Sequence, residues 1–338
     1  MKVLLGMSGG LDSTYAARVL LDAGHTVAGA VLVMHDYTET REARESAASL
    51  GIPLYEIDCR AGFDAAVVAP FCAAYLSGKT PNPCILCNER VKFRYLFEAM
   101  RELGFDRIAT GHYARIEEKD GRFAVCRARD ERKDQSYVLY RLSQEQLSHL
   151  LTPLSDYEKA DVRALAAAAD LAAADRAESM EICFLPDGNY PAYITDRFGA
   201  PPAGDFIATD GRVLGRHRGI LHYTVGQRKG LGIALGERMF VSHIDPVANT
   251  VTLSRDAERG SLRFTVTDPV FSGISPRDEG QGRFTVKLRY LAPPVPVTVR
   301  FEGGRVQATL DTPAPALTPG QSAVFYEGDR VAFGGFIE

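Results

Sequence analysis

The first 110 residues alternate short apolar runs with helical segments, and this alternation constrains the fold more than any other feature. Strand-like runs occupy Lys2–Met7, Val27–Met34, Leu54–Ile57 and Arg107–Thr110, and helical spacing is found at Thr14–Leu21 and Glu39–Leu50. Strands that alternate with helices form a parallel sheet covered on both faces, and ligands bind such a sheet at the carboxyl ends of its strands. We therefore predict an α/β domain with its site at that edge.

The character of the chain changes near Gly199. Before it, further helical patterns occur at Gln144–Leu151, Tyr157–Ala169 and Tyr190–Phe198. The stretch from Gly199 to Gly204 is typical of a linker. After it, short strand-like runs a few residues apart predict a small barrel or sandwich, at Arg263–Val266, Arg283–Tyr290, Val295–Phe301, Val306–Leu310 and Ala323–Tyr326. We predict three domains, 1–198, 199–260 and 261–338, the second β-rich and the third a β-barrel.

Length and composition agree with a multidomain globular protein. A chain of 338 residues exceeds one typical domain, and 46% apolar with 24% charged residues excludes collagen-like, coiled-coil and mostly disordered chains. No run approaches the roughly 18 apolar residues of a membrane helix. The N-terminal MKVLLGMSGG is too short and too soon interrupted for a signal peptide. We expect a cytoplasmic protein without a membrane partner.

The net charge of −4 hides an uneven distribution. Residues 1–200 carry 23 Lys and Arg against 29 Asp and Glu, whereas residues 201–338 carry 16 against 14. Gly211–Gly230 holds five cations and no acid: Arg212, Arg216, Arg218, Arg228 and Lys229. Such a run is often only a solvated face. Interleaved with His222 and Tyr223, it favours a surface that contacts phosphates.

The first strand ends in Ser8-Gly9-Gly10-Leu11-Asp12-Ser13, and a helix follows. Paired glycines allow a sharp turn, and a helix N-terminus favours phosphate. No Lys follows the glycines, so the Walker pattern is absent. By itself the loop is equally consistent with a plain turn capped by Asp12 or Ser13.

This loop resembles the PP-loop of the N-type ATP pyrophosphatases, which split ATP into AMP and pyrophosphate while adenylating an oxygen. The resemblance implies ATP and Mg²⁺ as cofactors, with Asp12 helping to hold the metal. It implies a nucleotide site formed by Gly6, Met7, Ser8, Gly9, Gly10, Leu11, Asp12, Ser13 and Met34. Met34, at the end of the second strand, matches the position that meets the adenine.

Six cysteines and no export signal favour reactive thiols over structural disulfides. Cys59, Cys72 and Cys126 lie in segments where a small buried apolar residue is expected. Cys84 and Cys87 form a C-x-x-C just before a helical pattern, and a thiol at a helix N-terminus has a lowered pKa. A structural zinc site is disfavoured, because the sequence has no second pair of ligands for it. A thioredoxin-like redox site is disfavoured too, because its C-x-x-C would lie at the start of the first helix.

Further motifs follow in order along the chain. They are Asn82-Pro-Cys-Ile-Leu-Cys-Asn88, Thr110-Gly-His-Tyr-Ala-Arg115, Lys133-Asp-Gln-Ser-Tyr137, Glu181-Ile-Cys-Phe184, His222–Gly232, Arg289-Tyr290 and Pro319–Tyr326. Together they resemble the tRNA-specific 2-thiouridylases over nearly the whole chain. That family places sulfur on C2 of the wobble uridine, position 34, of tRNAs for Lys, Glu and Gln.

The resemblance also implies roles for single residues. Cys87 matches the catalytic cysteine, Cys183 the persulfide carrier, and Gly111 an ATP-contacting backbone position. Positions that match tRNA contacts are Asn82, Pro83, Cys84, Lys133, Asp134, Gln135, Arg289 and Tyr290, to which the basic run adds Arg228 and Lys229. The anticodon loop of tRNA and a sulfur-donor or sulfur-relay protein are the expected partners.

One departure leaves the sulfur chemistry open. Many members have Asp where this chain has Cys84, so three cysteines converge: Cys84, Cys87 and Cys183. Related tRNA thiolases hold a 4Fe-4S cluster with three cysteines, and inorganic sulfide bound there would replace the persulfide. In the persulfide route Cys87 and Cys183 form a disulfide, which implies a mobile loop around Cys183.

For two polar residues, His112 and Asp134, the sequence leaves two possible roles open. His112 lies either by the phosphates or at a strand end, and Asp134 either orients substrate or shapes a turn. Two rival functions also remain. A PP-loop enzyme with a small-molecule substrate, such as an amidating synthetase, leaves Cys87 and Cys183 without a role. A non-catalytic RNA-binding or metal-holding protein leaves the ATP loop without one.

Overall fold

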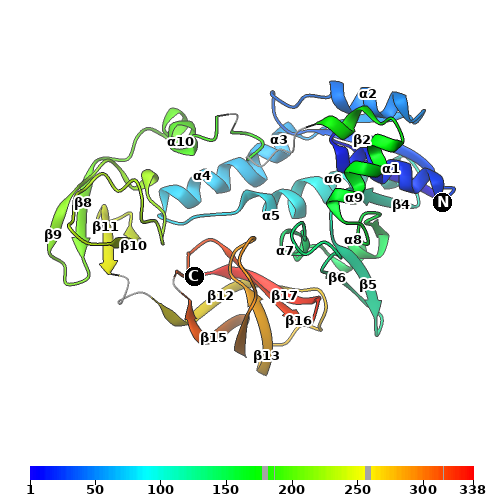
Figure 1. Ribbon diagram of the computed structural model, residues 1–338. Helices are drawn as coiled ribbons and strands as arrows, with labels where there is room; N and C mark the ends of the chain where they lie inside the picture. The colour runs from blue at the N-terminus through cyan, green and yellow to red at the C-terminus, as the bar shows by residue number, and fades with distance from the viewer. Residues whose placement is uncertain (177–181, 186, 256–259, 315) are drawn as a thin grey trace.

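The described part of the chain contains three β-sheets, and Figure 1 shows the first at the N-terminal end, the second at the opposite end and the third below them. The computed structural model describes residues 1–176, 182–185, 187–255, 260–314 and 316–338. Ser179, Met180 and Glu181, which belong to the stretch before Cys183, lie outside the described residues. In the described part of the chain, no helix is long and apolar enough to cross a membrane.

The first sheet is wholly parallel, with the order β3-β2-β1-β4-β7. Its strands are β1 (Lys2–Gly6), β2 (Thr26–Val33), β3 (Leu54–Asp58), β4 (Arg107–Thr110) and β7 (Leu150–Leu151). Along β1, Val3 and Leu5 pack into one core cluster, whereas Leu4 packs into another. This alternation shows that both faces are covered by helices, and it confirms the predicted α/β architecture.

Helices cover this sheet from both sides. Residues of α1 (Leu11–Asp22) and α9 (Lys159–Ala168) pack in the cluster that contains Val3, and residues of α6 (Phe93–Glu102) pack in the one that contains Leu4. The remaining helical segments of this part are α2 (Arg41–Ser49), α3 (Arg60–Phe63), α4 (Ala69–Leu76), α5 (Pro83–Cys87), α7 (Ser136–Leu139), α8 (Gln144–His149), the 3₁₀ turn Ala172–Asp175 and α10 (Tyr190–Phe198).

Two helical runs contain a π-helical turn. Residues 60–76 are continuous through the π-turn Asp64–Val68, which joins α3 to α4. Residues 83–102 are continuous through the π-turn Asn88–Lys92, which joins α5 to α6, and we call this run the thiol helix. It begins at Pro83, so the prediction that a helix begins only after Cys87 was wrong. Asn82 caps the helix, because its side-chain oxygen accepts the Cys84 N–H at 3.1 Å.

The second sheet forms a small domain with the order β10-β11-β8-β9. Its strands are β8 (Gly204–Ala208), β9 (Val213–His217), β10 (Met239–Asp245) and β11 (Thr250–Arg255), and a 3₁₀ turn covers Ile220–His222. Phe206, Tyr223, Val241 and Leu253 form part of its own core. The segment between α4 and α5 touches this domain, since a Cβ on Gly78 would lie 3.0 Å from the Ile244 carbonyl.

The third sheet closes into a barrel, as predicted. Its strands are β12 (Ser261–Phe271), β13 (Glu279–Lys287), β14 (Val295–Glu302), β15 (Arg305–Ala314), β16 (Ser322–Glu327) and β17 (Arg330–Ile337). They follow the order β12-β15-β14-β13-β16-β17, and pairing of β12 with β17 closes the ring. Inside, the rings of Phe325 and Phe333 stack with centroids 4.3 Å apart. The barrel also pairs through β17 with the hairpin β5 (Arg115–Lys119)–β6 (Arg122–Cys126).

Three details differ from the prediction. The helix expected at Gln144–Leu151 ends at His149, because Leu150 and Leu151 pair with β4 as an edge strand. The strand expected at Arg283–Tyr290 ends at Lys287, which leaves Arg289 and Tyr290 in a loop. The hairpin β5–β6 and strand β17 were not predicted, although each pairs with a strand that is its neighbour in sequence.

Candidate functional site

The loop after β1 turns sharply into α1. Gly9 has φ +82°, and a Cβ there would lie 2.5 Å from backbone atoms in the first turn of α2. Ser13 fixes the loop from the helix side, because its Oγ accepts the Ser8 N–H at 3.2 Å and donates to the Gly10 carbonyl at 3.1 Å. The loop therefore presents the N-terminus of a 12-residue helix at the carboxyl edge of the sheet, which suits phosphate.

Gly111 follows β4 and packs directly on this loop. A Cβ at Gly111 would lie 2.8 Å from the carbonyl carbon of Asp12 and 2.9 Å from the nitrogen of Ser13. Gly6, the last residue of β1, faces Leu96, whose Cδ1 would lie 3.0 Å from a Cβ at Gly6. The structure thus brings the residues that the resemblance assigned to ATP to one edge of the sheet, from both β1 and β4.

Two residues that the sequence analysis missed hold Asp12. Its Oδ1 accepts from Lys159 Nζ at 2.6 Å and from the Tyr113 hydroxyl at 2.8 Å. The Lys159 side chain is only 10% exposed. Tyr113 belongs to the Thr110–Arg115 motif and could have been singled out. Lys159 carries no sequence signal, because it comes from α9, 147 positions away from Asp12.

Arg176 holds the loop from its other side. Its Nη1 donates to the Gly9 carbonyl and, at 3.0 Å, to Ser46 Oγ, while its Nη2 pairs with Glu45 Oε2 at 3.1 Å. The Arg176 side chain is largely buried. A cation beside this loop adds positive potential where the resemblance places the phosphates of ATP.

Met34 links the loop region to the thiol helix. It follows β2 directly, and its Sδ lies 3.8 Å from the Sγ of Cys87. The position expected to meet the adenine therefore touches the cysteine expected to be catalytic. Cys87 is 5% exposed, in the core between the sheet and the thiol helix.

The pKa values of Cys87 and Cys183 are raised, which corrects the prediction of a lowered pKa for Cys87. Burial raises the pKa of Cys87 to about 12, and the thiols of Cys183 and Cys84 add to the shift. Although the Cys183 residue is exposed as a whole, protein atoms around its thiol reduce solvation, and this desolvation, together with Cys84, raises the pKa of Cys183. The helix dipole is ineffective, because Cys87 lies inside a continuous helical run and not at its start.

Lys92 opposes this effect. It closes the π-turn, and its ammonium lowers the pKa of both Cys87 and Cys183. Burial lowers the pKa of Lys92 itself, but the three neighbouring thiols raise it, and the net shift is upward. A π-turn has one residue more than an α-turn. Lys92, the fifth residue after Cys87, therefore lies beside Cys87 where the fourth residue would lie in a regular α-helix. The sequence analysis missed Lys92.

Phe184, the neighbour of Cys183, packs on the helical run 60–76, and the Cys183 thiol is close enough to Cys87 to raise its pKa. The Phe184 ring makes edge contacts with Phe63 and Phe71, with centroids 5.6 and 5.2 Å apart. Cys183 itself is exposed, as is Cys84. All six cysteines are free thiols. The expected mobile loop around Cys183 concerns residues 177–181 and 186, which lie outside the described residues.

The cluster alternative does not fit this arrangement. In the ranges that the structure describes, no three His, Cys, Asp or Glu side chains are arranged to hold a metal ion, and this includes Cys84, Cys87 and Cys183. The thiols are close enough to shift one another's pKa but do not converge on one point. A 4Fe-4S cluster is therefore not supported.

His112 and Asp134 each favour one of their two interpretations. The Nδ1 of His112 lies 2.8 Å from Thr110 Oγ1, at the end of β4. Burial, and then Lys92, lower the pKa of His112 to about 3, so the ring is neutral near pH 7. Asp134 is buried, and its carboxylate accepts from the Ser136 hydroxyl at 2.8 Å and the Ser136 N–H at 3.1 Å. It shapes the turn.

The other positions expected to contact tRNA lie in separate segments of the chain. Gln135 exchanges hydrogen bonds with Tyr113 at 2.8 and 2.9 Å, next to Lys133. Burial, with smaller effects of Asp134 and Cys84, raises the pKa of Tyr290 to about 12, which shows that Tyr290 lies near the start of the thiol helix. Arg289 donates to the Val225 carbonyl at 3.2 Å and joins the barrel to the central domain.

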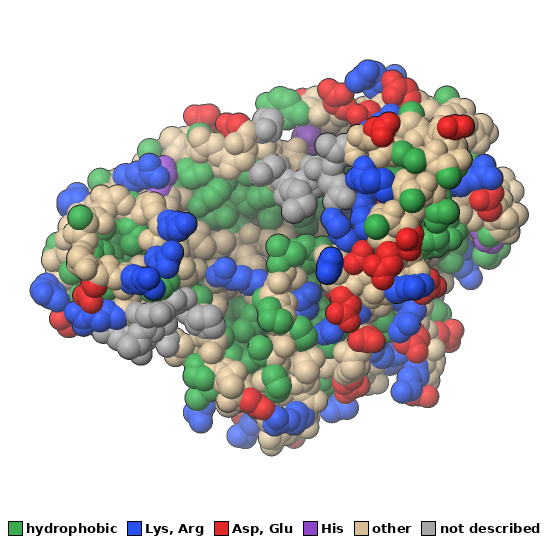
Figure 2. All heavy atoms as spheres, viewed as in Figure 1, with side chains coloured by type: hydrophobic (Ala, Val, Ile, Leu, Met, Phe, Trp, Pro, Cys, Tyr) green, Lys and Arg blue, Asp and Glu red, His purple; other side chains and the backbone are tan. Residues whose placement is uncertain are grey.

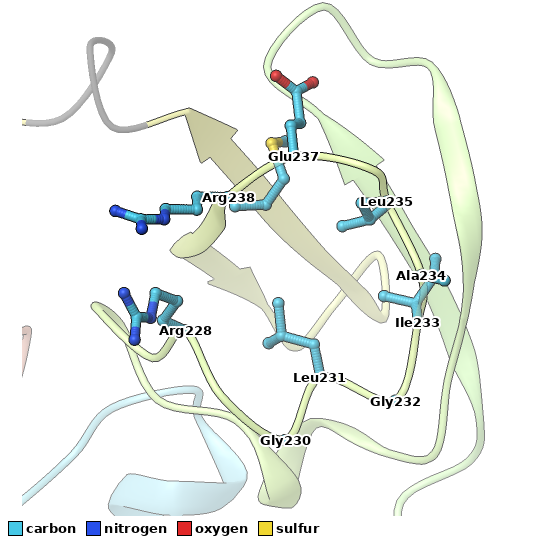
Figure 3. A pocket seen from close by; sticks show the side chains of 10 residues that line it. Arg228, Gly230, Leu231, Gly232, Ile233, Ala234, Leu235, Glu237 and Arg238 are labelled. Atoms are coloured by element: carbon cyan, nitrogen blue, oxygen red, sulfur yellow. The ribbon is translucent and has the colours of Figure 1, made fainter.

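Arg228 and Lys229 are exposed on the central domain. Arg228 borders a pocket of about 480 Å³ that Leu231, Leu235, Glu237 and Arg238 also line. Figure 3 shows the Arg228 and Arg238 side chains extending to the same side of the pocket. Figure 2 shows mostly basic side chains on this domain, and acidic and basic ones mixed on the N-terminal domain. The basic run therefore forms part of a surface.

These features define a class. A glycine turn between β1 and α1 at the edge of a parallel sheet, with no Walker lysine, is typical of the PP-loop proteins of the HUP type. Three family models match along the chain: "tRNA methyl transferase HUP domain" at residues 1–187, "tRNA methyl transferase PRC-barrel domain" at 192–255 and "Aminomethyltransferase beta-barrel domain" at 261–337.

Curated relatives match over the full length. The chain is 44% identical to the tRNA-specific 2-thiouridylase MnmA of Moorella thermoacetica, over 99% of both chains. It is 41% identical to that of Clostridium perfringens, over 100% of this chain and 98% of the relative. The chain belongs to the tRNA-specific 2-thiouridylase family. Among solved structures, NMN synthetase from Francisella tularensis aligns with 52% of this chain and 66% of its own at 18% identity and a TM-score of 0.35.

Proposed function

We propose that this protein catalyses ATP-dependent 2-thiolation of uridine 34 in tRNAs for Lys, Glu and Gln. The observation that carries the proposal is the contact between Met34, beside the ATP loop, and Cys87, with Cys183 close by. It unites a nucleotide site and a pair of thiols in one place. The curated relatives, which match over the whole chain, are thiouridylases. The thiols suit sulfur transfer better than the methyl transfer named by two family models.

The first step activates the base. ATP binds with its phosphates at the N-terminus of α1, and the uracil O2 attacks the α-phosphorus, so pyrophosphate leaves and O2 carries AMP. Gly9, Gly10 and the α1 amides orient the phosphates, and Arg176 adds positive charge. The carboxylate of Asp12 is the oxygen donor that Mg²⁺ prefers, and a bound Mg²⁺ would neutralise phosphate charge there. Lys159 and Tyr113 hold that carboxylate in place.

The second step transfers sulfur. A persulfide on Cys183 attacks C2 with its terminal sulfur, and AMP leaves with the electron pair of the C2–O bond. The Cys87 thiolate then attacks the Cys183 Sγ, and the electron pair of the broken S–S bond goes to the sulfur on C2. The products are 2-thiouridine and a Cys87–Cys183 disulfide, which a thiol reductant must reopen. A sulfur-donor or relay protein supplies the persulfide sulfur.

The tRNA is proposed to bind across the three domains, 1–198, 199–260 and 261–338. The anticodon loop would reach the thiols past Asn82, Pro83 and Cys84, where single-stranded bases can be splayed out. Arg228 and Lys229 would contact phosphates from the central domain, and Arg289 and Tyr290 from the barrel. Lys133 and Gln135 would contact the tRNA beside the thiol helix. We place the reaction in the cytoplasm.

One experiment separates this proposal from its rivals. Purified protein is incubated with ATP, and pyrophosphate release is measured with and without tRNA for Glu, alongside 2-thiouridine formation with a sulfur donor. We expect tRNA to stimulate release and Cys87→Ser to abolish thiouridine but retain release. Release that does not respond to tRNA would favour a small-molecule substrate. No release at all would favour a non-catalytic RNA-binding protein.

A further inference from the structure

Arg141 lies between the thiol helix and the barrel, in a position that no catalytic step above uses. Its side chain is 5% exposed. Its Nε donates to Glu89 Oε2 at 2.8 Å and its Nη2 to Asp268 Oδ2 at 2.8 Å, while Nη1 donates to the Asp268 carbonyl at 3.2 Å. The guanidinium also lies over the Phe336 ring, 5.0 Å from its centroid. We call this arrangement the Glu89–Arg141–Asp268 bridge.

One end of the bridge is the π-turn that follows Cys87. Glu89 is the second residue of that turn. The first, Asn88, is buried and donates from Nδ2 to the Val138 carbonyl at 3.0 Å. Both residues that follow Cys87 are therefore fixed by the segment 138–141. A π-turn is intrinsically less favourable than an α-turn, so contacts from outside must maintain it.

The other end of the bridge is the barrel. Asp268 has φ +50° and lies where the register of β12 with β17 shifts, between Thr267 and Val270. A non-glycine residue in this conformation is held there by its surroundings. Two tyrosines in the segment around Arg141 also contact the barrel. The Tyr137 hydroxyl donates to the Ser322 carbonyl at 2.8 Å, and that of Tyr140 lies 2.9 Å from Ser322 Oγ.

We propose that Arg141 is a positioning residue through which the C-terminal barrel holds the π-turn and thereby places the Cys87 thiol. Its effect on sulfur transfer rests on the proposed function, but its effect on the position of Cys87 does not. Without the guanidinium, the mostly buried Glu89 loses its 2.8 Å charge-assisted partner and retains a longer ion pair with Arg90, at 3.4 Å. The π-turn then relaxes toward regular helix, and this shifts Cys87 relative to Met34. The barrel is thus part of the thiol site as well as a surface for RNA.

The test compares Arg141→Met, which keeps the aliphatic stem, with Arg141→Lys and Asp268→Asn. The matched control is Arg94→Met, which removes an exposed pair with Glu98 on the same helix. Alkylation of Cys87 in the free protein is followed by peptide mass spectrometry. Single-turnover thiouridine formation and tRNA-dependent pyrophosphate release are measured in parallel.

We expect Arg141→Met to raise the Cys87 alkylation rate and to slow thiouridine formation by about tenfold or more, with pyrophosphate release within about twofold. Arg141→Lys and Asp268→Asn should show smaller effects in the same direction, and Arg94→Met none. A Cys87 alkylation rate in Arg141→Met equal to that of the wild type would overturn the proposal. Equal losses of thiouridine formation and pyrophosphate release, with a lowered Tm, would overturn it too. If wild-type protein forms no thiouridine, the proposed function fails, and the alkylation result alone then decides the role of Arg141.

Discussion

Replacement of Gly9 by Ala should disable the nucleotide loop. A left-handed conformation costs an L-residue about 1–2 kcal/mol, and Gly9 has φ +82°. The new Cβ would also lie 2.5 Å from backbone atoms of α2, which no side-chain rotation can relieve. Ordinary carbon contacts begin near 3.5 Å, so the loop must move by about 1 Å. A displacement of that size can cost about 100-fold in rate.

Gly10 provides the matched control. Its φ is −70°, and the nearest atom to an added Cβ is Ser8 Oγ at 3.5 Å, an ordinary contact. Pyrophosphate release with tRNA present, at varied ATP, gives kcat/KM for both variants. We expect Gly9→Ala to lose about 100-fold and Gly10→Ala less than about fivefold, since only a weak helix cap changes. Similar values for the two variants would show that the close approach to α2 is irrelevant to ATP use.

Three further predictions concern the residues around the loop and the thiols. Lys159→Met should lower kcat/KM for ATP by about tenfold or more, because a 2.6 Å ion pair to the loop carboxylate is lost. The tRNA affinity, measured by filter binding, should stay unchanged. Unaltered kinetics would contradict the role of this ion pair. Cys183→Ser should form no thiouridine but still release pyrophosphate, and Cys126→Ser should retain both reactions, as product analysis can show; thiouridine from Cys183→Ser would exclude the persulfide route. The pKa of His112 falls from 6.5 to about 3 in the folded protein, so its contribution to stability is present above pH 6.5 and is lost as the pH falls toward 3. In His112→Asn, the free energy of unfolding measured with urea should therefore depend less on pH over that range. An unchanged pH dependence would show that the ring is solvated.

The sequence predicted the elements whose pattern is local. The periodicity of the first 110 residues was sufficient for four of the five strands of the parallel sheet, β1 to β4. Strand β17 was missed although Val331 and Phe333 are buried, because Gly334 and Gly335 interrupt its pattern. These glycines are explained only by the fold, since a Cβ on Gly334 would lie 2.6 Å from the Tyr140 ring.

Residues of the candidate site that belong to a sequence motif were predicted. Residues that reach the site only through tertiary contacts were missed. Asp12 was found from the loop, but its partner Lys159 lies in a helix with no distinguishing pattern. The pKa of Cys87 was predicted with the wrong sign, because the sequence shows a helix beginning nearby but does not show that Pro83 starts it earlier. Burial is a property of the whole fold, and it outweighs the local dipole.

The raised pKa of Cys87 constrains how the proposed reaction can run. With a pKa of about 12, Cys87 is almost entirely a neutral thiol near pH 7 in the free protein. The attack on Cys183 requires the thiolate, so an enzyme that kept this environment during turnover would lose most of its sulfur-transfer rate. Lys92 already stabilises the thiolate, and burial is the larger opposing effect. We therefore expect tRNA binding to change the surroundings of Cys87, so that Cys87 is alkylated faster with tRNA bound than without it.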